Sequence, residues 1–244
     1  MDFKDQVKLA LEINQISAEG RPKGPVPVNF GIVVFPGFQA LDAFGPLDAL
    51  NTLSLNFPMK LSILAETLNS VSTKIPYPNS FGSDFGQSIN PTHTFASHPP
   101  LDVLLVPGGI GAMHPSIQSA IDFVAKVYPS LQYLITVCNG AGIAARGGIL
   151  DGKKATTNKM QWWPETAQRE QVKWVAHARW VVDGNIWTSS GVSAGLDAVF
   201  AFISAIYGEE AAEKVANILE YERHKDPQWD PYAEIYGLPG NPSR

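Results

Sequence analysis

The chain has 244 residues, of which 45% are hydrophobic and only 17% are charged. This balance predicts a sizeable buried core and excludes a disordered chain. The net charge of -5 comes from acidic and basic residues scattered along the sequence, so no basic run can neutralise a row of phosphates. We therefore expect no nucleic-acid partner.

The cysteine content and the N-terminus bound the environment of the protein. Cys138 is the single cysteine, so it can form neither an intramolecular disulfide nor, without a histidine cluster, a closed zinc site. The first residues carry charges where a signal peptide needs an apolar core, and the longest apolar run is far shorter than the ~18 residues of a membrane span. These features predict a cytoplasmic protein with no metal and no membrane partner.

Hydrophobic periodicity and turn residues divide the chain into elements. Residues 1–26 form an N-terminal extension with a short amphipathic helix, and the domain itself spans 27–223. Strands are expected over 28–36, 59–66, 101–109 and 131–139, helices over 41–54, 116–128, 194–207 and 209–222, and a hairpin within 172–191. Residues 224–244 make a proline-rich tail packed on the domain or on a partner subunit.

The strands are continuous apolar runs separated by helices, which is typical of a parallel sheet covered on both faces. Ligands bind such sheets at the carboxyl ends of the strands, so the strand-to-helix turns are the places to search. The turn at Gly109-Ile110-Gly111 starts like a dinucleotide fingerprint, but His114 stands in place of the third glycine. A tight turn is the better interpretation there.

A second turn, from Gly191 to Gly195, matches the G-x-S-x-G motif of serine hydrolases. The only downstream histidine, His224, follows a predicted helix and has no strand-end acid before it. We therefore interpret Ser193 as a helix N-cap and the glycines as residues that let a helix approach the sheet.

The third turn carries Cys138, which ends a buried strand just before Gly140 begins a helix. Unpaired N–H groups at a helix N-terminus favour a thiolate, although a lone buried cysteine often packs as a small apolar residue. A nucleophile needs a group that exchanges protons, and Asp42 lies at the mouth of the first strand. Since parallel strands end at one edge, Asp42, Gly109 and Cys138 are expected to converge.

The segments "FPGFQALDAFGP", "LDVLLVPGGIG", "ITVCNGAGIAARGGILDGKKATTNKMQWW" and "TSSGVSAGLDAVFAFI" together resemble the DJ-1/PfpI superfamily over residues 28–221. The acid in "LDxxGP", "ATT" after the elbow helix and "EY" before the tail prolines are most similar to the isocyanide hydratase branch. The resemblance implies a flavodoxin-like α/β sandwich with a mostly parallel sheet, a homodimer and no cofactor.

Carried over, the resemblance implies that Cys138 is the nucleophile and Asp42 the carboxyl group beside it. The backbone N–H groups of Gly109 and Asn139 would form an anion-binding pocket. Two positions depart from that branch: Asn139 stands where the hydratases have threonine, and Asn158 stands where they often have histidine.

The expected activity is that of a hydro-lyase, adding water to a small-molecule isocyanide through a thioimidate on Cys138. Candidate pocket residues are Ile110, Asn158, Trp162 and Trp163, the two tryptophans having aromatic packing as an alternative. A glyoxalase-like or other small-molecule lyase or hydrolase, or a redox sensor without turnover, would use the same cysteine.

Overall fold

The computed structural model describes residues 2, 4–6, 15–75, 77, 78 and 80–238. Most of the amphipathic helix expected before residue 17 lies outside these residues. The division into 1–26, 27–223 and 224–244 stays a prediction.

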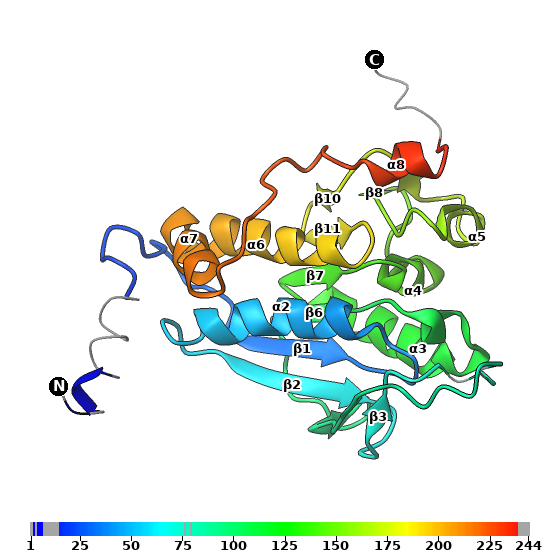
Figure 1. The fold of residues 1–244 in the computed structure, drawn as a ribbon, viewed down its shortest axis with the longest axis horizontal. Helices are drawn as coiled ribbons and strands as arrows, with labels where there is room; N and C mark the ends of the chain where they lie inside the picture. Colours follow the sequence, from blue (N-terminus) through cyan, green and yellow to red (C-terminus); the bar gives the residue numbers. More distant parts are fainter. Residues whose placement is uncertain (1, 3, 7–14, 76, 79, 239–244) are drawn as a thin grey trace.

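A seven-stranded sheet forms the centre of the molecule (Figure 1), with the strand order β10-β11-β7-β6-β1-β2-β5. Every neighbouring pair is parallel except the hairpin of β10 and β11. The mostly parallel, flavodoxin-like sheet expected from the sequence is thus confirmed. The strands are β1 (Asn29–Val33), β2 (Lys60–Ala65), β5 (His93–Thr94), β6 (Val103–Val106), β7 (Tyr133–Thr136), β10 (Trp180–Asp183) and β11 (Ile186–Ser189).

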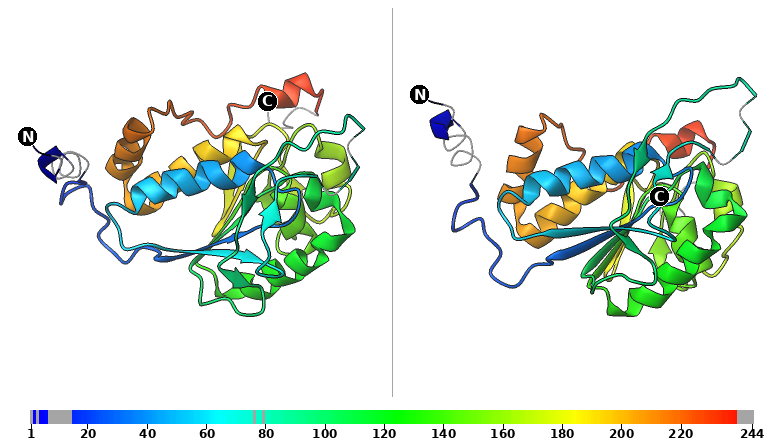
Figure 2. Two further views of the ribbon diagram at one scale, coloured as in Figure 1. Left: turned by 60° about the horizontal axis from the view of Figure 1, so that its bottom comes forward. Right: turned by 90° about the horizontal axis from the view of Figure 1, so that it is seen from below.

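Helices cover both faces of this sheet, which explains why its inner strands read as unbroken apolar runs. Figure 2 shows α2 (Ala40–Leu53), α6 (Ser193–Tyr207) and α7 (Glu209–Ile218) together on one face. The other face carries α3 (Gln118–Val127) and α4 (Gly140–Arg146), which contact each other. All four residues of β6 and of β11 are buried between these layers.

Several details differ from the sequence-based prediction. Val192 rather than Ser193 is the N-cap of α6, because the helix already begins at Ser193. The helix predicted over 209–222 ends at Ile218, and the tail contains a short helix, α8 (Tyr232–Ile235). Two small sheets were not expected: β3 (Val71–Ser72) pairs with β4 (Ser88–Ile89), and β8 (Lys154–Ala155) with β9 (Lys173–Trp174).

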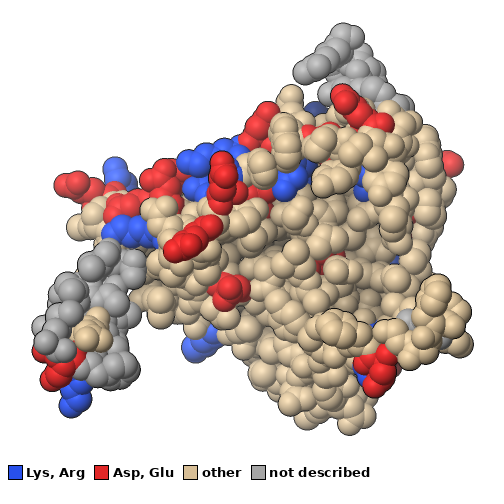
Figure 3. All heavy atoms as spheres, in the orientation of Figure 1, with Lys and Arg blue, Asp and Glu red and all other residues tan. Residues whose placement is uncertain are grey.

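Charged side chains of both signs mix on the surface over α7 and the chain that follows it (Figure 3). Glu209 pairs there with Lys225 at 2.6 Å and with Arg223 at 3.2 Å. None of the helices in the described part of the chain is long and apolar enough to cross a membrane.

Candidate active site

The turns after β1, β6 and β7 meet at the carboxyl edge of the sheet, because β6 lies between the other two strands. Asp42 stands in the first turn of α2, and its Oδ2 accepts a hydrogen bond from the Gly108 backbone N–H at 2.9 Å. The Cys138 side chain hydrogen-bonds the same carboxyl group. The structure therefore brings Asp42, the Gly108–Gly109 turn and Cys138 together.

The backbone of Cys138 adopts a conformation that few side chains tolerate. Its φ is 59°, between the end of β7 and the start of α4. Such a conformation costs on the order of 1–3 kcal/mol and persists only where the surroundings hold it. Here the Cys138 N–H donates to Ser190 O at 3.1 Å, and Thr157 Oγ1 donates to Cys138 O at 3.1 Å. The sulfur is thus fixed on a sharp turn.

Three N–H donors surround the sulfur. Asn158 Nδ2 lies 3.1 Å from Cys138 Sγ, and the backbone N–H groups of Asn139 and Val192 also hydrogen-bond it. Val192 has a φ of 25°, rare for a β-branched residue, and this backbone turn aims its N–H at the sulfur. Gly191 leaves room for Asn158, because a Cβ there would lie 2.8 Å from Nδ2.

The three donors do not make Cys138 an acidic thiol. Burial and the nearby negative charge of Asp42 raise the pKa of Cys138 to about 12, although the three donors act in the opposite direction. The N–H of Asn139, the N-cap of α4, does favour the thiolate as expected, but burial and the charge of Asp42 outweigh it, so the resting site holds a protonated thiol. Only 6% of the residue is exposed, and desolvation outweighs the donors.

Asp42 is a buried carboxyl group that can exchange a proton near neutral pH. Its exposed fraction is 1%, and burial raises its pKa from 3.8 to about 7, opposed by hydrogen bonds from Gly108 and Cys138. Its Oδ1 has no hydrogen-bond partner among the described residues. A carboxyl group with such a pKa and a free oxygen beside a sulfur is suited to general acid-base work.

Burial of Asp42 should also make the protein less stable as the pH rises. A pKa raised from 3.8 to about 7 means that the folded state holds this proton more tightly, so stability falls between about pH 4 and 7. We expect Asp42→Asn to be more stable than the wild type by roughly 2–4 kcal/mol at pH 8, with little gain at pH 4. Urea unfolding at both pH values measures this, and an equal difference at both would contradict it.

The Asn139 side chain occupies part of the predicted anion pocket. Its Oδ1 accepts from the Gly109 N–H at 2.7 Å, and its Nδ2 donates to Gly109 O at 3.1 Å and to Gln161 Oε1 at 2.8 Å. Gly108 permits this approach, since a Cβ there would lie 2.2 Å from Asn139 Oδ1. The Gly109 N–H can bind a substrate anion only if the Asn139 carboxamide moves away.

The remaining candidate pocket residues differ in burial: Ile110 and Trp163 are exposed, whereas Trp162 is buried. Ile110 and Trp163 are 44% and 61% exposed. Trp162 is buried in an apolar cluster with Ala176, Ala233 and Leu238, so its ring packs beneath the tail. This is the aromatic packing that the sequence left open for it.

Two further residues noted in the sequence lie outside the site. The His114 ring packs edge-to-face against Tyr77 with ring centroids 5.3 Å apart, and its Nδ1 lies within hydrogen-bond distance of Ser116 Oγ at 2.8 Å. Ser193 is exposed.

The sequence analysis did not identify two further parts of this site, the segment Ser190–Val192 and Glu165. The segment Ser190–Val192 contacts Cys138, whereas its G-x-S-x-G pattern suggested only a helix approach. Glu165 is 1% exposed, and burial raises its pKa while Arg146 and Asn139 act to lower it. The pattern did mark the segment, but its role depends on backbone torsions that no pattern specifies.

Removing the Asn158 side chain should slow the chemistry of the thiol. A hydrogen bond to a charged group contributes about 1.5–3 kcal/mol, so Asn158→Ala should reduce the rate of Cys138 alkylation by about tenfold or more. Iodoacetamide labelling followed by intact mass measures the rate at this single cysteine. The exposed Asn217→Ala is the matched control, and equal rates in the two variants would remove Asn158 from the site.

The model of the DJ-1/PfpI family matches residues 30–206 of this chain, which include both Asp42 and Cys138. The chain belongs to the DJ-1/PfpI family. It is 30% identical to an isonitrile hydratase of Pseudomonas putida over 80% of this chain and 78% of that protein. A solved ThiJ/PfpI family protein from Pseudomonas syringae is 28% identical with a TM-score of 0.66, covering 83% of this chain and 82% of that one.

Some relatives within this DJ-1/PfpI group are regulators. The transcriptional regulator GbdR of Pseudomonas aeruginosa is 28% identical over 59% of this chain, but the match spans only 39% of the regulator. The family therefore includes both hydratase-like and regulator-like proteins.

Proposed function

We propose that this DJ-1/PfpI protein is a lyase that adds water to an organic isocyanide and releases an N-substituted formamide. The observation that carries the proposal is the free Oδ1 of a buried carboxyl group, Asp42, beside a sulfur held by three N–H donors. The 30% identity to an isonitrile hydratase over most of both chains supports it.

In the first step, the Cys138 proton passes to Asp42 and the thiolate attacks the terminal carbon of the isocyanide. A carbon–sulfur bond forms, and Asp42 delivers its proton to that carbon, which gives a thioimidate R–N=CH–S. Asn158 and the N–H groups of Asn139 and Val192 stabilise the sulfur while it carries negative charge.

In the second step, the Asp42 carboxylate takes a proton from a water molecule while the water oxygen attacks the thioimidate carbon. That proton reaches the nitrogen, the carbon–sulfur bond breaks, and the formamide R–NH–CHO leaves. The second water proton returns to Cys138, so the site is restored. One carboxyl group that first donates and then accepts suits a pKa of about 7.

The raised pKa of Cys138 disfavours the alternative of a redox sensor, because sensor cysteines are acidic and exposed. A glyoxalase-like or other small-molecule lyase or hydrolase would use the same pair, Asp42 and Cys138, and remains the alternative enzyme.

The test of isocyanide hydration uses the purified protein and an aromatic isocyanide, and chromatography measures the formamide that is formed. Formamide at a rate proportional to protein supports the proposal, and no formamide from a protein whose Cys138 still alkylates contradicts it.

We further propose that the protein is a homodimer. An open groove of about 650 Å³ lies between α2, β2, α6 and the end of α7, and its lining is mostly apolar, with the exposed Leu41 and Leu61 beside the polar Asp48 and Asn51. Apolar grooves of this kind are common where subunits meet. Light scattering on the purified protein gives the subunit number, and a monomer at all concentrations would contradict the proposal.

A further inference from the structure

The C-terminal segment 226–238 is tied to the body of the protein by a buried ion pair. This segment places α8 beside α5 (Trp162–Thr166), as Figure 1 shows. Ala233 and Leu238 belong to the same buried apolar cluster as Trp162. Asp230 Oδ2 lies 3.1 Å from Lys159 Nζ, and each side chain is only 1% exposed. Burying two charges is costly, so this pair is expected to serve more than stability.

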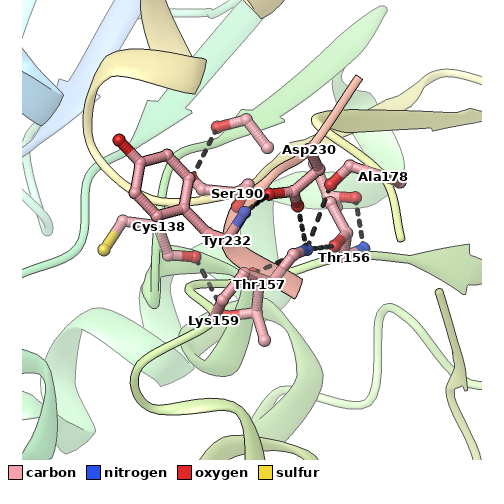
Figure 4. A network of polar contacts seen from close by, with 10 residues as sticks. Cys138, Thr156, Thr157, Lys159, Ala178, Ser190, Asp230 and Tyr232 are labelled. Atoms are coloured by element: carbon pink, nitrogen blue, oxygen red, sulfur yellow. Dashed lines mark hydrogen bonds and ion pairs between the residues drawn. The ribbon is translucent and has the colours of Figure 1, made fainter. Parts of the chain in front are cut away.

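Lys159 also makes hydrogen bonds to three oxygens of the surrounding loops. Its Nζ donates to Thr156 Oγ1 at 2.5 Å, to Thr157 O at 3.3 Å and to Ala178 O at 3.0 Å. Figure 4 shows the ammonium group between the carboxylate of the tail and these oxygens. Residues 156–159 are therefore linked to the tail through this ion pair, in addition to the hydrogen bond from the Thr156 N–H to Thr188 Oγ1 at 2.9 Å.

The same loop holds the nucleophile. Thr157 Oγ1 donates to Cys138 O at 3.1 Å, and Asn158 Nδ2 lies 3.1 Å from Cys138 Sγ. Asn158 is therefore flanked by Thr157, which is hydrogen-bonded to the backbone of Cys138, and by Lys159, which forms an ion pair with Asp230. We expect a shift of Lys159 to move the Asn158 donor relative to the sulfur, because the two residues are adjacent in the chain.

We propose that Asp230 and Lys159 are positioning residues for Cys138, so that the tail segment around Asp230 is a working part of the active site. Asp230 fixes Lys159, Lys159 fixes residues 156–158, and these fix both the backbone and the sulfur of Cys138. The inference rests on the proposed role of Cys138 as nucleophile, but it does not depend on the isocyanide as substrate.

The test is the alkylation rate of Cys138 by iodoacetamide at pH 8, at a temperature where each variant is fully folded. Cys138 is the single cysteine of the chain, so intact mass reports on it alone. Asp230→Asn should slow alkylation at least fivefold, because Asn158 no longer stabilises the thiolate in place. A lower melting temperature with a rate within fivefold of wild type, or a faster rate, would show a merely structural role and overturn the proposal.

A second variant separates folding from positioning. Lys159→Met/Asp230→Leu replaces the buried ion pair by apolar side chains, a change that is often neutral or stabilising. The proposal expects slow alkylation even in this stable protein, and a rate within fivefold of wild type overturns it.

Lys225→Met is the matched control for both variants. This substitution removes the ion pair between Lys225 and Glu209, whose side chains are 58% and 46% exposed, respectively. It should alkylate like the wild type. Because no isocyanide is used, failure of hydration and failure of positioning are told apart.

Discussion

Cys138→Ala should lower isocyanide turnover by more than about 10⁴-fold, because no other group on the described residues near Asp42 can form the covalent intermediate. Cys138 carries the only thiol of the chain, and its sulfur is where Asn158 Nδ2 and two backbone N–H groups converge. The measurement is the rate of formamide formation at saturating substrate. The variant should keep the wild-type fold, which circular dichroism checks.

The matched control for the cysteine is Ser193→Ala. Ser193 is exposed and belongs to the G-x-S-x-G pattern, so this variant also tests the serine hydrolase interpretation. We expect wild-type turnover from it. Turnover that survives in Cys138→Ala and disappears in Ser193→Ala would reverse the assignment of the nucleophile.

Asp42→Asn should separate the reactivity of the thiol from turnover. The asparagine cannot carry protons to and from the substrate, so turnover should fall by about 10²- to 10⁴-fold. The charge that raises the pKa of Cys138 is also gone, so alkylation by iodoacetamide should be at least as fast as in the wild type. Asp122→Asn, an exposed carboxyl group on α3, is the control.

The pH profile of the wild type gives a second readout of Asp42. With a pKa of about 7 for Asp42 and about 12 for Cys138, the pair holds two protons at low pH and one between these values. The reactive form has one proton, since the thiolate attacks while Asp42 donates. We expect kcat/KM to rise up to about pH 7 and then level off. A break near pH 7 that persists in Asp42→Asn would assign it to another group.

The fold could be predicted from the sequence because its strands are unbroken apolar runs. "VNFGIVVFP" and "LDVLLVPGG" have no alternation, and such runs separated by helices are typical of a parallel sheet covered on both faces. Short edge pairs such as β3 with β4 escaped prediction, because two residues carry no period. The N-cap of α6 was also missed, since Val192 is not a capping residue type.

The part of the candidate site that depends only on strand topology could be predicted from the sequence. Parallel strands end at one edge, which was enough to bring Asp42 and Cys138 together. The protonation of the thiol could not be predicted, because it depends on how completely the sulfur is removed from water. Nor could the Asn139 carboxamide that covers the Gly109 N–H, since its position is set by the rotamer.

The ion pair between Lys159 and Asp230 also has a consequence for the order of biosynthesis. Asp230 leaves the ribosome about ninety residues after Cys138, which at cellular elongation rates is roughly 5–20 s later. The sheet and its turns can already have assembled by then, whereas the loop that holds the sulfur still lacks its anchor. A nascent chain would therefore carry a slowly reacting thiol until the segment around Asp230 docks, which limits unwanted reactions of the cysteine during synthesis.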